Sequence, residues 1–358
     1  MSAPLVSVCL PVFNGEKFLP LAIQSVLNQT FPDFELIVVD DGSSDRTREI
    51  VAEFAGRDQR IRLHVNESNL GLFANYNRCM EHSTGKYIKP FAQDDLWSNS
   101  IIARMVKELD ARPGVSLVAC ARNYVDGEGR IFDTKRHHDQ DCEIDGKKAA
   151  FEMISRIDNV IGEPCAVMFR REQAGKGFED RLPQMGDLDC WARLLQLGNL
   201  FYITDALCTF RVHQGGQTTR LIAGLDYLAE IVTVKELHRE LLESGGLSQE
   251  QIASDTLAKA VEVTEYATSV LGINYLESDF AGVKRRPREI GLLLVDALKR
   301  LAIVEREQSN ARSEASFLES ENSRLRRELN DLLNSPSWKV TAGLRHVKKL
   351  TSSLFESR

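Results

Sequence analysis

The sequence lacks the segments that would carry it across a membrane. A spanning helix needs about 18 or more consecutive apolar residues, and the longest candidate, residues 290–295, is far too short. The first residues, Met-Ser-Ala-Pro, contain no basic region followed by an apolar stretch, so no secretory signal is visible. These absences predict a cytoplasmic protein, whose contact with a membrane would be peripheral, at the inner face of the cytoplasmic membrane.

Clustered cysteines are also missing. The chain has seven cysteines, but they are scattered, and none belongs to a C-x-x-C pair. Zinc sites and disulfide frameworks both need clustered spacings. The sequence therefore predicts reduced thiols at Cys9, Cys79, Cys120, Cys142, Cys165, Cys190 and Cys208.

An excess of positive charge is missing as well. The formal net charge is −7, whereas a general nucleic-acid binder needs a basic footprint. We therefore expect no nucleic-acid partner. Apolar residues make up 43% of the chain, so a sizeable core can form, and a length of 358 residues predicts two or three units rather than one.

Apolar segments alternate with amphipathic ones through the first 125 residues. Leu19, Ile23 and Val26 recur at helical spacing after the first apolar segment, and similar patterns follow the later ones. Strands alternating with helices predict right-handed βαβ units, and therefore an α/β fold with a mostly parallel sheet covered on both faces. The predicted strands are residues 5–10, 35–39, 61–65, 87–92 and 116–121, and then 165–169 and 207–212.

Two pairs of acidic residues stand at the ends of predicted strands. Asp40-Asp41 follows the second strand, and Asp94-Asp95 follows the fourth. Ligands bind such sheets at the carboxyl ends of the strands. A carboxylate accepts well from the N3–H of a pyrimidine, and a divalent cation held by carboxylates neutralises a diphosphate. By itself, each pair is also typical of a solvated acidic turn or a helix cap.

Two further candidates lie later in the chain. Asp187 begins a predicted helix and could act as a general base, although an acid there is also typical of stabilisation by the helix dipole. Asp189 stands two residues away and cannot share its helical face, so at most one of the two points into a cleft. His213 follows a predicted strand and could bind a metal or steady a diphosphate, although a lone histidine is more often structural.

The first 97 residues resemble glycosyltransferase family 2, the inverting enzymes. The resemblance begins with V-S-V-C-L-P-V-F-N-G at residues 6–15 and ends with the D-x-D-like element Q-D-D at 93–95. Residues 187–193 and 210–213 are similar to two later elements of the family, E-D-x-D-x-W and Y-R-x-H. Between residues 15 and 93 the matching segments are S-V-L-N-Q-T-F at 25–31, E-L-I-V-V-D-D-G-S-S-D at 35–45, N-L-G at 69–71 and A-N-Y-N at 74–77.

The resemblance implies a GT-A fold, which is a Rossmann-like, mostly parallel sheet with helices on both faces. It implies a role for each of seven residues. Gly186 departs from the family, which often has Glu there, so only Asp187 remains of that acidic pair. The implied roles are nucleotide contact for Pro11, Phe13 and Asp40, ribose or diphosphate contact for Asp94, binding of Mg or Mn by Asp95 and His213, and general base catalysis by Asp187.

The last sixty-odd residues have a different pattern. Apolar residues occupy heptad positions from residue 294, and Asn322 at an a position favours a parallel dimer in defined register. Ser335-Pro336 ends that helix. The basic, amphipathic segment that follows suits an anionic membrane surface and resembles the S-x-S-W tails of bacterial surface-polysaccharide enzymes. An ordinary basic helix that docks on its own protein is the alternative.

Four parts are predicted along the chain: a GT-A catalytic domain at 1–220, a helical extension at 221–292, a coiled coil at 293–334 and the basic tail at 335–358. The predicted activity moves a sugar from a nucleotide-diphosphate sugar of UDP or dTDP type. The predicted acceptor is a hydroxyl of a lipid-linked or growing glycan in O-antigen or capsule synthesis. We expect a homo-oligomer, formed through the coiled coil.

Two other functions stay open at this point. A nucleotidyltransferase also has a doubly wound sheet and metal-binding aspartates, but it usually has a glycine-rich basic loop where this chain has P-V-F-N-G. An inactive glycosyltransferase-like scaffold is the other alternative, and the missing acid at Gly186 favours it.

Overall fold

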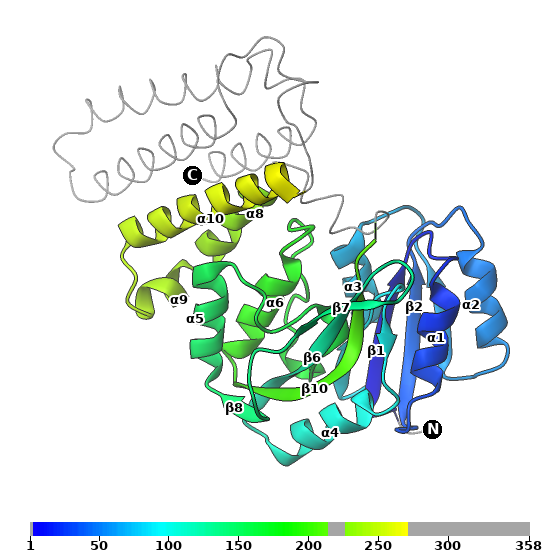
Figure 1. The fold of residues 1–358 in the computed structure, drawn as a ribbon. Helices are drawn as coiled ribbons and strands as arrows, with labels where there is room; N and C mark the ends of the chain where they lie inside the picture. Colours follow the sequence, from blue (N-terminus) through cyan, green and yellow to red (C-terminus); the bar gives the residue numbers. More distant parts are fainter. Residues whose placement is uncertain (1–2, 214–225, 271–358) are drawn as a thin grey trace, which may run out of the picture. The chain divides into compact units, whose positions relative to one another are not determined.

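The structure is a computed structural model that describes residues 3–213 and 226–270 (Figure 1). The predicted coiled coil and basic tail lie outside these residues. No helix within them is long and apolar enough to cross a membrane. The described chain forms two units: the first comprises 3–213 and 236–245, and the second comprises 226–235 and 246–270.

Four parallel strands form the first half of the sheet. They are β1 (Val6–Val12), β2 (Phe34–Asp40), β3 (Ile61–Val65) and β4 (Tyr87–Pro90). Their order across the sheet is β3-β2-β1-β4, and every neighbouring pair is parallel. This order confirms the predicted βαβ units, because parallel neighbours need a crossover connection.

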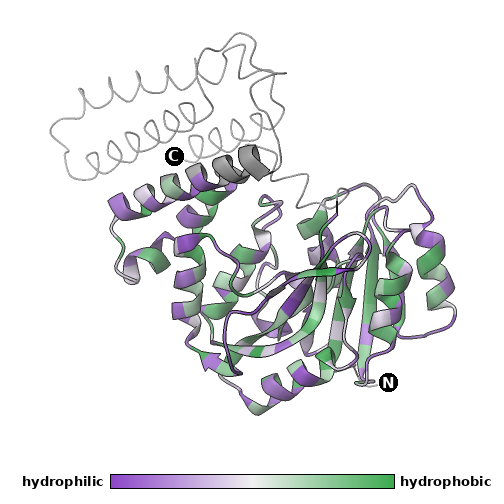
Figure 2. Ribbon diagram, in the orientation of Figure 1, coloured by the Kyte–Doolittle hydropathy of each residue, from purple (hydrophilic) through white to green (hydrophobic). Residues whose placement is uncertain are grey.

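Three helices make those crossovers: α1 (Leu19–Leu27), α2 (Thr47–Ala55) and α3 (Leu72–Glu81). The predicted stripe on the first of them is correct, since Leu19, Ile23 and Val26 are all buried. Every residue of β1 and β2 is buried as well, because helices cover both faces of the sheet (Figures 1 and 2). Full burial of one such aliphatic side chain stabilises the fold by roughly 1.5–3 kcal/mol.

The second half of the sheet contains both strand directions. From β4 the order continues through β9, β6 and β10 to β5, while β7 pairs with β6 and β8 pairs with β10. β9 is antiparallel to both of its neighbours, whereas β10 is parallel to β6. These strands are β5 (Leu96–Trp97), β6 (Val115–Val125), β7 (Ile131–Lys135), β8 (Cys142–Ile144), β9 (Val167–Arg170) and β10 (Asn199–Arg211).

The remaining helices connect these strands or follow them. A 3-10 turn, η1 (Pro164–Ala166), leads into β9, and a second, η2 (Arg171–Gln173), follows it. The other helices are α4 (Ile101–Ala111), α5 (Gly146–Arg156), α6 (Gly186–Leu195), α8 (Asp226–Leu237), α9 (Arg239–Ser244) and α10 (Gln249–Val270).

The cysteines agree with the prediction from their spacing. All seven are free thiols, and six of them are buried. Burial raises the pKa of Cys9 to about 12, which keeps that thiol protonated and unreactive.

The topology brings distant loops to one edge of the sheet. Because β1, β2 and β4 run parallel, the residues that follow them meet at the same carboxyl edge. Phe13 follows β1, Asp40 ends β2, and Asp94-Asp95 comes shortly after β4. The two acidic pairs that stood out in the sequence therefore share the edge where ligands bind such sheets.

Candidate active site at the carboxyl edge of the sheet

The loop after β1 is bound to the segment after β4. The backbone N–H of Phe13 donates to Oε1 of Gln93 at 2.8 Å, and Nε2 of Gln93 donates to the carbonyl of Phe13 at 3.0 Å. A Cβ on Gly15 would lie 2.5 Å from the same amide, so a larger residue there would displace Gln93 from Phe13. The Phe13 side chain is 42% exposed, whereas Pro11 is a buried residue of β1 opposite Val39.

The same loop is bound to the loop after β2. Asn14 has a positive φ of 48°, a conformation that asparagine tolerates better than most residues. Its N–H donates to Oγ of Ser43 at 2.9 Å, and its side-chain oxygen accepts from the N–H of Ser44 at 2.9 Å. The two loops at this edge are thereby held together by hydrogen bonds between backbone N–H groups and side-chain oxygens.

Asp40 has one carboxylate oxygen in use and one without a partner. Its Oδ2 accepts from the N–H of Ser43 at 3.1 Å and from Nε of Arg48 at 2.7 Å. Its Oδ1 is buried and has no hydrogen-bond partner in the structure. A buried acceptor without a donor is costly, so a ligand N–H at this position would be favoured.

Asp41 has a different role. Its Oδ1 accepts from the N–H of Leu70 and from the amide of Asn66, and its Oδ2 accepts from the N–H of Gly71. Gly71 has a positive φ of 89°, which glycine adopts at little cost. Both oxygens of Asp41 therefore shape the loop before α3, so Asp41 is a buried structural residue rather than part of a solvated turn.

Asp94 and Asp95 point to different partners. Asp95 is 2% exposed, and its Oδ1 accepts from the backbone N–H of Arg211 at 2.8 Å. Burial raises the pKa of Asp95 well above its ordinary value, and the neighbouring charge of Asp94 adds to the effect. The Asp94 side chain is 24% exposed, and its Oδ2 lies 3.0 Å from Nε2 of His213.

Arg211 joins three segments of the site. Besides its backbone bond to Asp95, its Nε donates to the carbonyl of Asp94 at 2.8 Å, and its Nη1 donates to the carbonyl of Asp126 at 3.0 Å. Its guanidinium lies 4.7 Å from the ring centroid of Phe18, which also packs 5.1 Å from the ring of His213. The sequence offered only the Y-R-x-H pattern here and no hint of these contacts.

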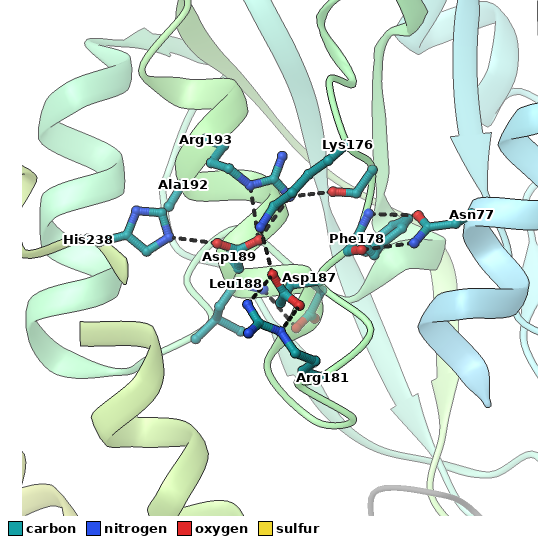
Figure 3. Close-up of polar contacts among 12 residues, drawn as sticks. Asn77, Lys176, Phe178, Arg181, Asp187, Leu188, Asp189, Ala192, Arg193 and His238 are labelled. Atoms are coloured by element: carbon teal, nitrogen blue, oxygen red, sulfur yellow. Dashed lines mark hydrogen bonds and ion pairs between the residues drawn. The ribbon is translucent and has the colours of Figure 1, made fainter. Parts of the chain in front are cut away.

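Asp187 lies in the first turn of α6 and is 6% exposed. Nδ2 of Asn159 donates to its Oδ2 at 3.1 Å, and the N–H of Leu188 donates to its Oδ1 at 2.8 Å. Asn159 comes from the loop before η1 and forms no motif with Asp187, so sequence reasoning missed it. Asp189 is turned toward Arg193 and His238 (Figure 3), whereas Asp187 contacts Asn159.

Gly186 has a steric reason to be glycine. A Cβ there would lie 2.6 Å from Cδ2 of Phe73 and 2.9 Å from the carbonyl of Glu179. An acidic side chain at position 186 would therefore displace the ring from α3. The departure from the family pattern follows from packing against Phe73 and removes no acid that this arrangement could hold.

The structure thus brings some of the predicted residues together. Asp94 contacts His213, and Phe13 contacts the Gln93 that precedes Asp94. Asp187 is oriented by Asn159 and by the start of α6. Within residues 3–213 and 226–270, no group of three or more His, Cys, Asp or Glu side chains could hold a metal ion unaided.

Comparison with known sequences identifies the family. The glycosyl transferase family 2 pattern matches residues 7–177. An uncharacterized protein of Mycobacterium tuberculosis is 31% identical over 232 residues, which cover 62% of this chain and 71% of that protein. The chain belongs to glycosyl transferase family 2. It is therefore a nucleotide-sugar-dependent glycosyltransferase.

Other comparisons agree with this assignment. The putative teichuronic acid biosynthesis glycosyltransferase TuaG of Bacillus subtilis is 28% identical to this transferase over 216 residues, which cover 58% of this chain and 79% of TuaG. TarS of S. aureus in complex with UDP-GlcNAc has a TM-score of 0.58 at 17% identity and covers 74% of this chain and 76% of its own. The mannosyltransferase PcManGT of Pyrobaculum calidifontis, in complex with GDP-Man and Mn2+, has a TM-score of 0.51 at 16% identity. The match covers 100% of this chain and 89% of PcManGT. The structural likenesses confirm the GT-A fold.

The steric account of Gly186 can be tested by adding one methyl group. Gly186→Ala should lower the free energy of unfolding by about 1–3 kcal/mol, because Phe73 must move, although alanine normally favours a helix over glycine. Urea denaturation measures the change. In a Phe73→Ala background the loss should be smaller, and equal losses in both backgrounds would contradict the proposed contact.

Proposed function

We propose that this transferase moves a sugar, with inversion, from a UDP- or dTDP-type donor to a hydroxyl of a lipid-linked or growing glycan in surface-polysaccharide assembly. One observation supports this above all. The pair of Asp94 and His213 stands at the same sheet edge as Asp40, whose buried Oδ1 has no partner. These residues are the ones that we propose for the diphosphate and for the nucleotide base, respectively.

The divalent cation fits Asp94 and His213. Their facing atoms lie 3.0 Å apart, which suits two adjacent ligands of an octahedral ion, since bonds of about 2.1 Å at a right angle separate the ligands by ~3 Å. Mg²⁺ and Mn²⁺ commonly take few protein ligands and complete their shell with substrate phosphates. A bound cation would neutralise the charge that develops on the leaving diphosphate.

Geometry favours Asp94 over Asp95 as the carboxylate ligand. The sequence prediction assigned the ion to Asp95, with Asp94 on the nucleotide side. Asp95 is almost wholly buried and accepts from the Arg211 backbone, whereas Asp94 is partly exposed and faces His213. We propose that Asp95 fixes the loop and that Asp94 and His213 hold the ion.

On the nucleotide side, we propose that Asp40 accepts the N3–H of the base and that the exposed Phe13 ring packs against it. The buried Oδ1 of Asp40 is an acceptor without a donor, and the N3–H of uracil or thymine is a donor of the right kind. Pro11 is a buried β1 residue, so its contribution would be to shape the strand end.

On the acceptor side, we propose Asp187 as the general base. Its carboxylate is oriented by Asn159 and by the N–H of Leu188. It would take the proton of the acceptor hydroxyl, whose oxygen then attacks the anomeric carbon from the face opposite the diphosphate. The bond to the diphosphate breaks as the new glycosidic bond forms, and this displacement inverts the configuration.

Substitution of the two neighbouring aspartates distinguishes the metal assignments. Asp94→Asn should weaken manganese-dependent donor binding about 10- to 100-fold or more, because it removes a charged ligand. Asp95→Asn keeps an acceptor for Arg211 and should lose far less. Calorimetry with UDP-sugars, with and without manganese, measures both. If Asp95→Asn instead loses most of its manganese-dependent donor affinity and Asp94→Asn keeps it, the prediction made from the sequence, with Asp95 as the ligand, would be restored.

Removal of the proposed base separates binding from chemistry. Asp187→Asn should lower kcat for sugar transfer by about 100- to 10,000-fold, because no group then accepts the acceptor proton. The donor Kd should stay unchanged, since Asp187 takes no part in nucleotide contact. Product formation from a panel of nucleotide sugars measures the rate, and a variant with normal kcat would exclude Asp187 as the base.

The roles of the C-terminal residues are also proposals. We propose that residues 293–334 form a homo-oligomeric coiled coil and that 335–358 contact an anionic membrane surface. A chain ending at residue 292 should lose self-association on light scattering and sedimentation with anionic vesicles, yet keep donor binding. An unchanged oligomer would reject the coiled coil, and unchanged sedimentation would reject the membrane contact.

A further inference from the structure

Asp189 is bound by a histidine that lies 49 residues further along the chain. Nε2 of His238 lies 3.1 Å from Oδ1 of Asp189, and Nε of Arg193 donates to Oδ2 at 2.9 Å (Figure 3). The side chains of Asp189 and His238 are only 2% and 4% exposed. Both oxygens of a buried carboxylate are therefore engaged, one of them by a residue from outside its own helix.

The contact between His238 and Asp189 affects Asp187 because the two aspartates are close together in α6. Asp187 and Asp189 both stand in the first turn of α6, so the backbone joins them rigidly. Each residue turns an α-helix by about 100°, so a rotation that frees Asp189 also redirects Asp187. The hydrogen bond from His238 therefore restricts the direction in which Asp187 points.

The charge state of Asp189 favours a strong contact. Burial by itself would raise the pKa of Asp189, but the hydrogen bond from His238 and the charge of Arg193 outweigh it and hold the pKa below its ordinary value. The carboxylate is thus charged at neutral pH. A buried charge that loses a partner is strongly unfavourable, so the helix resists any movement that breaks the bond.

The segment that carries His238 is distant from the strands of the sheet in sequence but belongs to the same unit. Residues 236–245 belong to the first unit, whereas the described residues before and after them belong to the second. Within this segment Leu242 is fully buried, and α9 packs against α5. The segment also lies well beyond residue 177, where the family match ends.

We propose that His238 is a positioning residue for the transfer reaction: by holding Asp189, it fixes the first turn of α6 and so aims the carboxylate of Asp187 at the acceptor. This inference rests on the proposed role of Asp187 as base. It makes residues 236–245 part of the transferring machinery, although they lie beyond residue 220, where the sequence predicted the catalytic domain to end.

Two substitutions of His238 in the full chain test the role of its Nε2 atom. The amide nitrogen of a glutamine side chain can occupy the place of Nε2, whereas the asparagine side chain is too short for its amide nitrogen to reach that place. His238→Asn should lower kcat for sugar transfer about 10- to 100-fold, because misplacement of the base by about 1 Å has an effect of this size. His238→Gln should recover most of the rate. The donor Kd should be the same in both.

Leu242→Ala is the matched control. It removes packing from the same segment but leaves the hydrogen bond, so it should lower Tm and leave kcat within about twofold of the parent. If His238→Asn lowers Tm in the same way and leaves kcat unchanged, the contact only stabilises the fold and the proposal is overturned. If both variants lower kcat equally, loss of packing explains the effect, which also overturns it.

Two more variants cover the remaining outcomes. Asp189→Glu keeps the charge and both partners but displaces the helix, so it should reduce kcat with normal donor affinity even if His238→Asn does not fold. A normal kcat in Asp189→Glu would overturn the positioning role. Asp187→Asn separates this inference from the proposed function. Normal sugar transfer by Asp187→Asn would refute Asp187 as the base. Loss of transfer in Asp187→Asn together with a normal kcat in His238→Asn would refute only the role of His238.

Discussion

The donors of Arg211 hold the candidate site together. Its backbone N–H binds the Asp95 carboxylate, and its side chain binds the carbonyls of Asp94 and Asp126. The loop after β4, the end of β10 and the loop after β6 are thereby joined at one residue. The guanidinium also offsets the charge of nearby carboxylates. His213 stands two residues further on and is placed against Asp94 as a result.

Three acidic pairs share one physical constraint. A carboxylate cannot lose water without partners, so the buried acids of all three pairs accept hydrogen bonds from the protein. Asp41, Asp95 and Asp189 accept from backbone N–H groups or from the side chains of Asn66, Arg193 and His238, and we propose a structural role for them. Their counterparts, Asp40, Asp94 and Asp187, are the acids that we propose for base recognition, metal binding and proton transfer.

Much of the fold could be predicted from local patterns. The apolar stripe of α1 was visible as periodicity, and the buried strands β1 and β2 were visible as apolar runs. Alternation along the chain predicted the parallel order of β1 to β4. The antiparallel insertion of β9 between β4 and β6 was not predictable, since the sequence of a four-residue strand carries no mark of its direction. The steric reason for Gly186 was equally invisible, because Phe73 lies more than a hundred residues away.

The sequence by itself determined the family, the strands that end in acids and the candidate residues, because these depend on residue types at short spacing. Only the tertiary structure decided which partners each acid has and that Asp94 is partly exposed while Asp95 is buried, and it reversed the expected order of these two in our proposal. It also supplied Arg211, Asn159 and His238 as partners. Side-chain direction depends on contacts between segments far apart in the chain, and no local pattern reports those contacts.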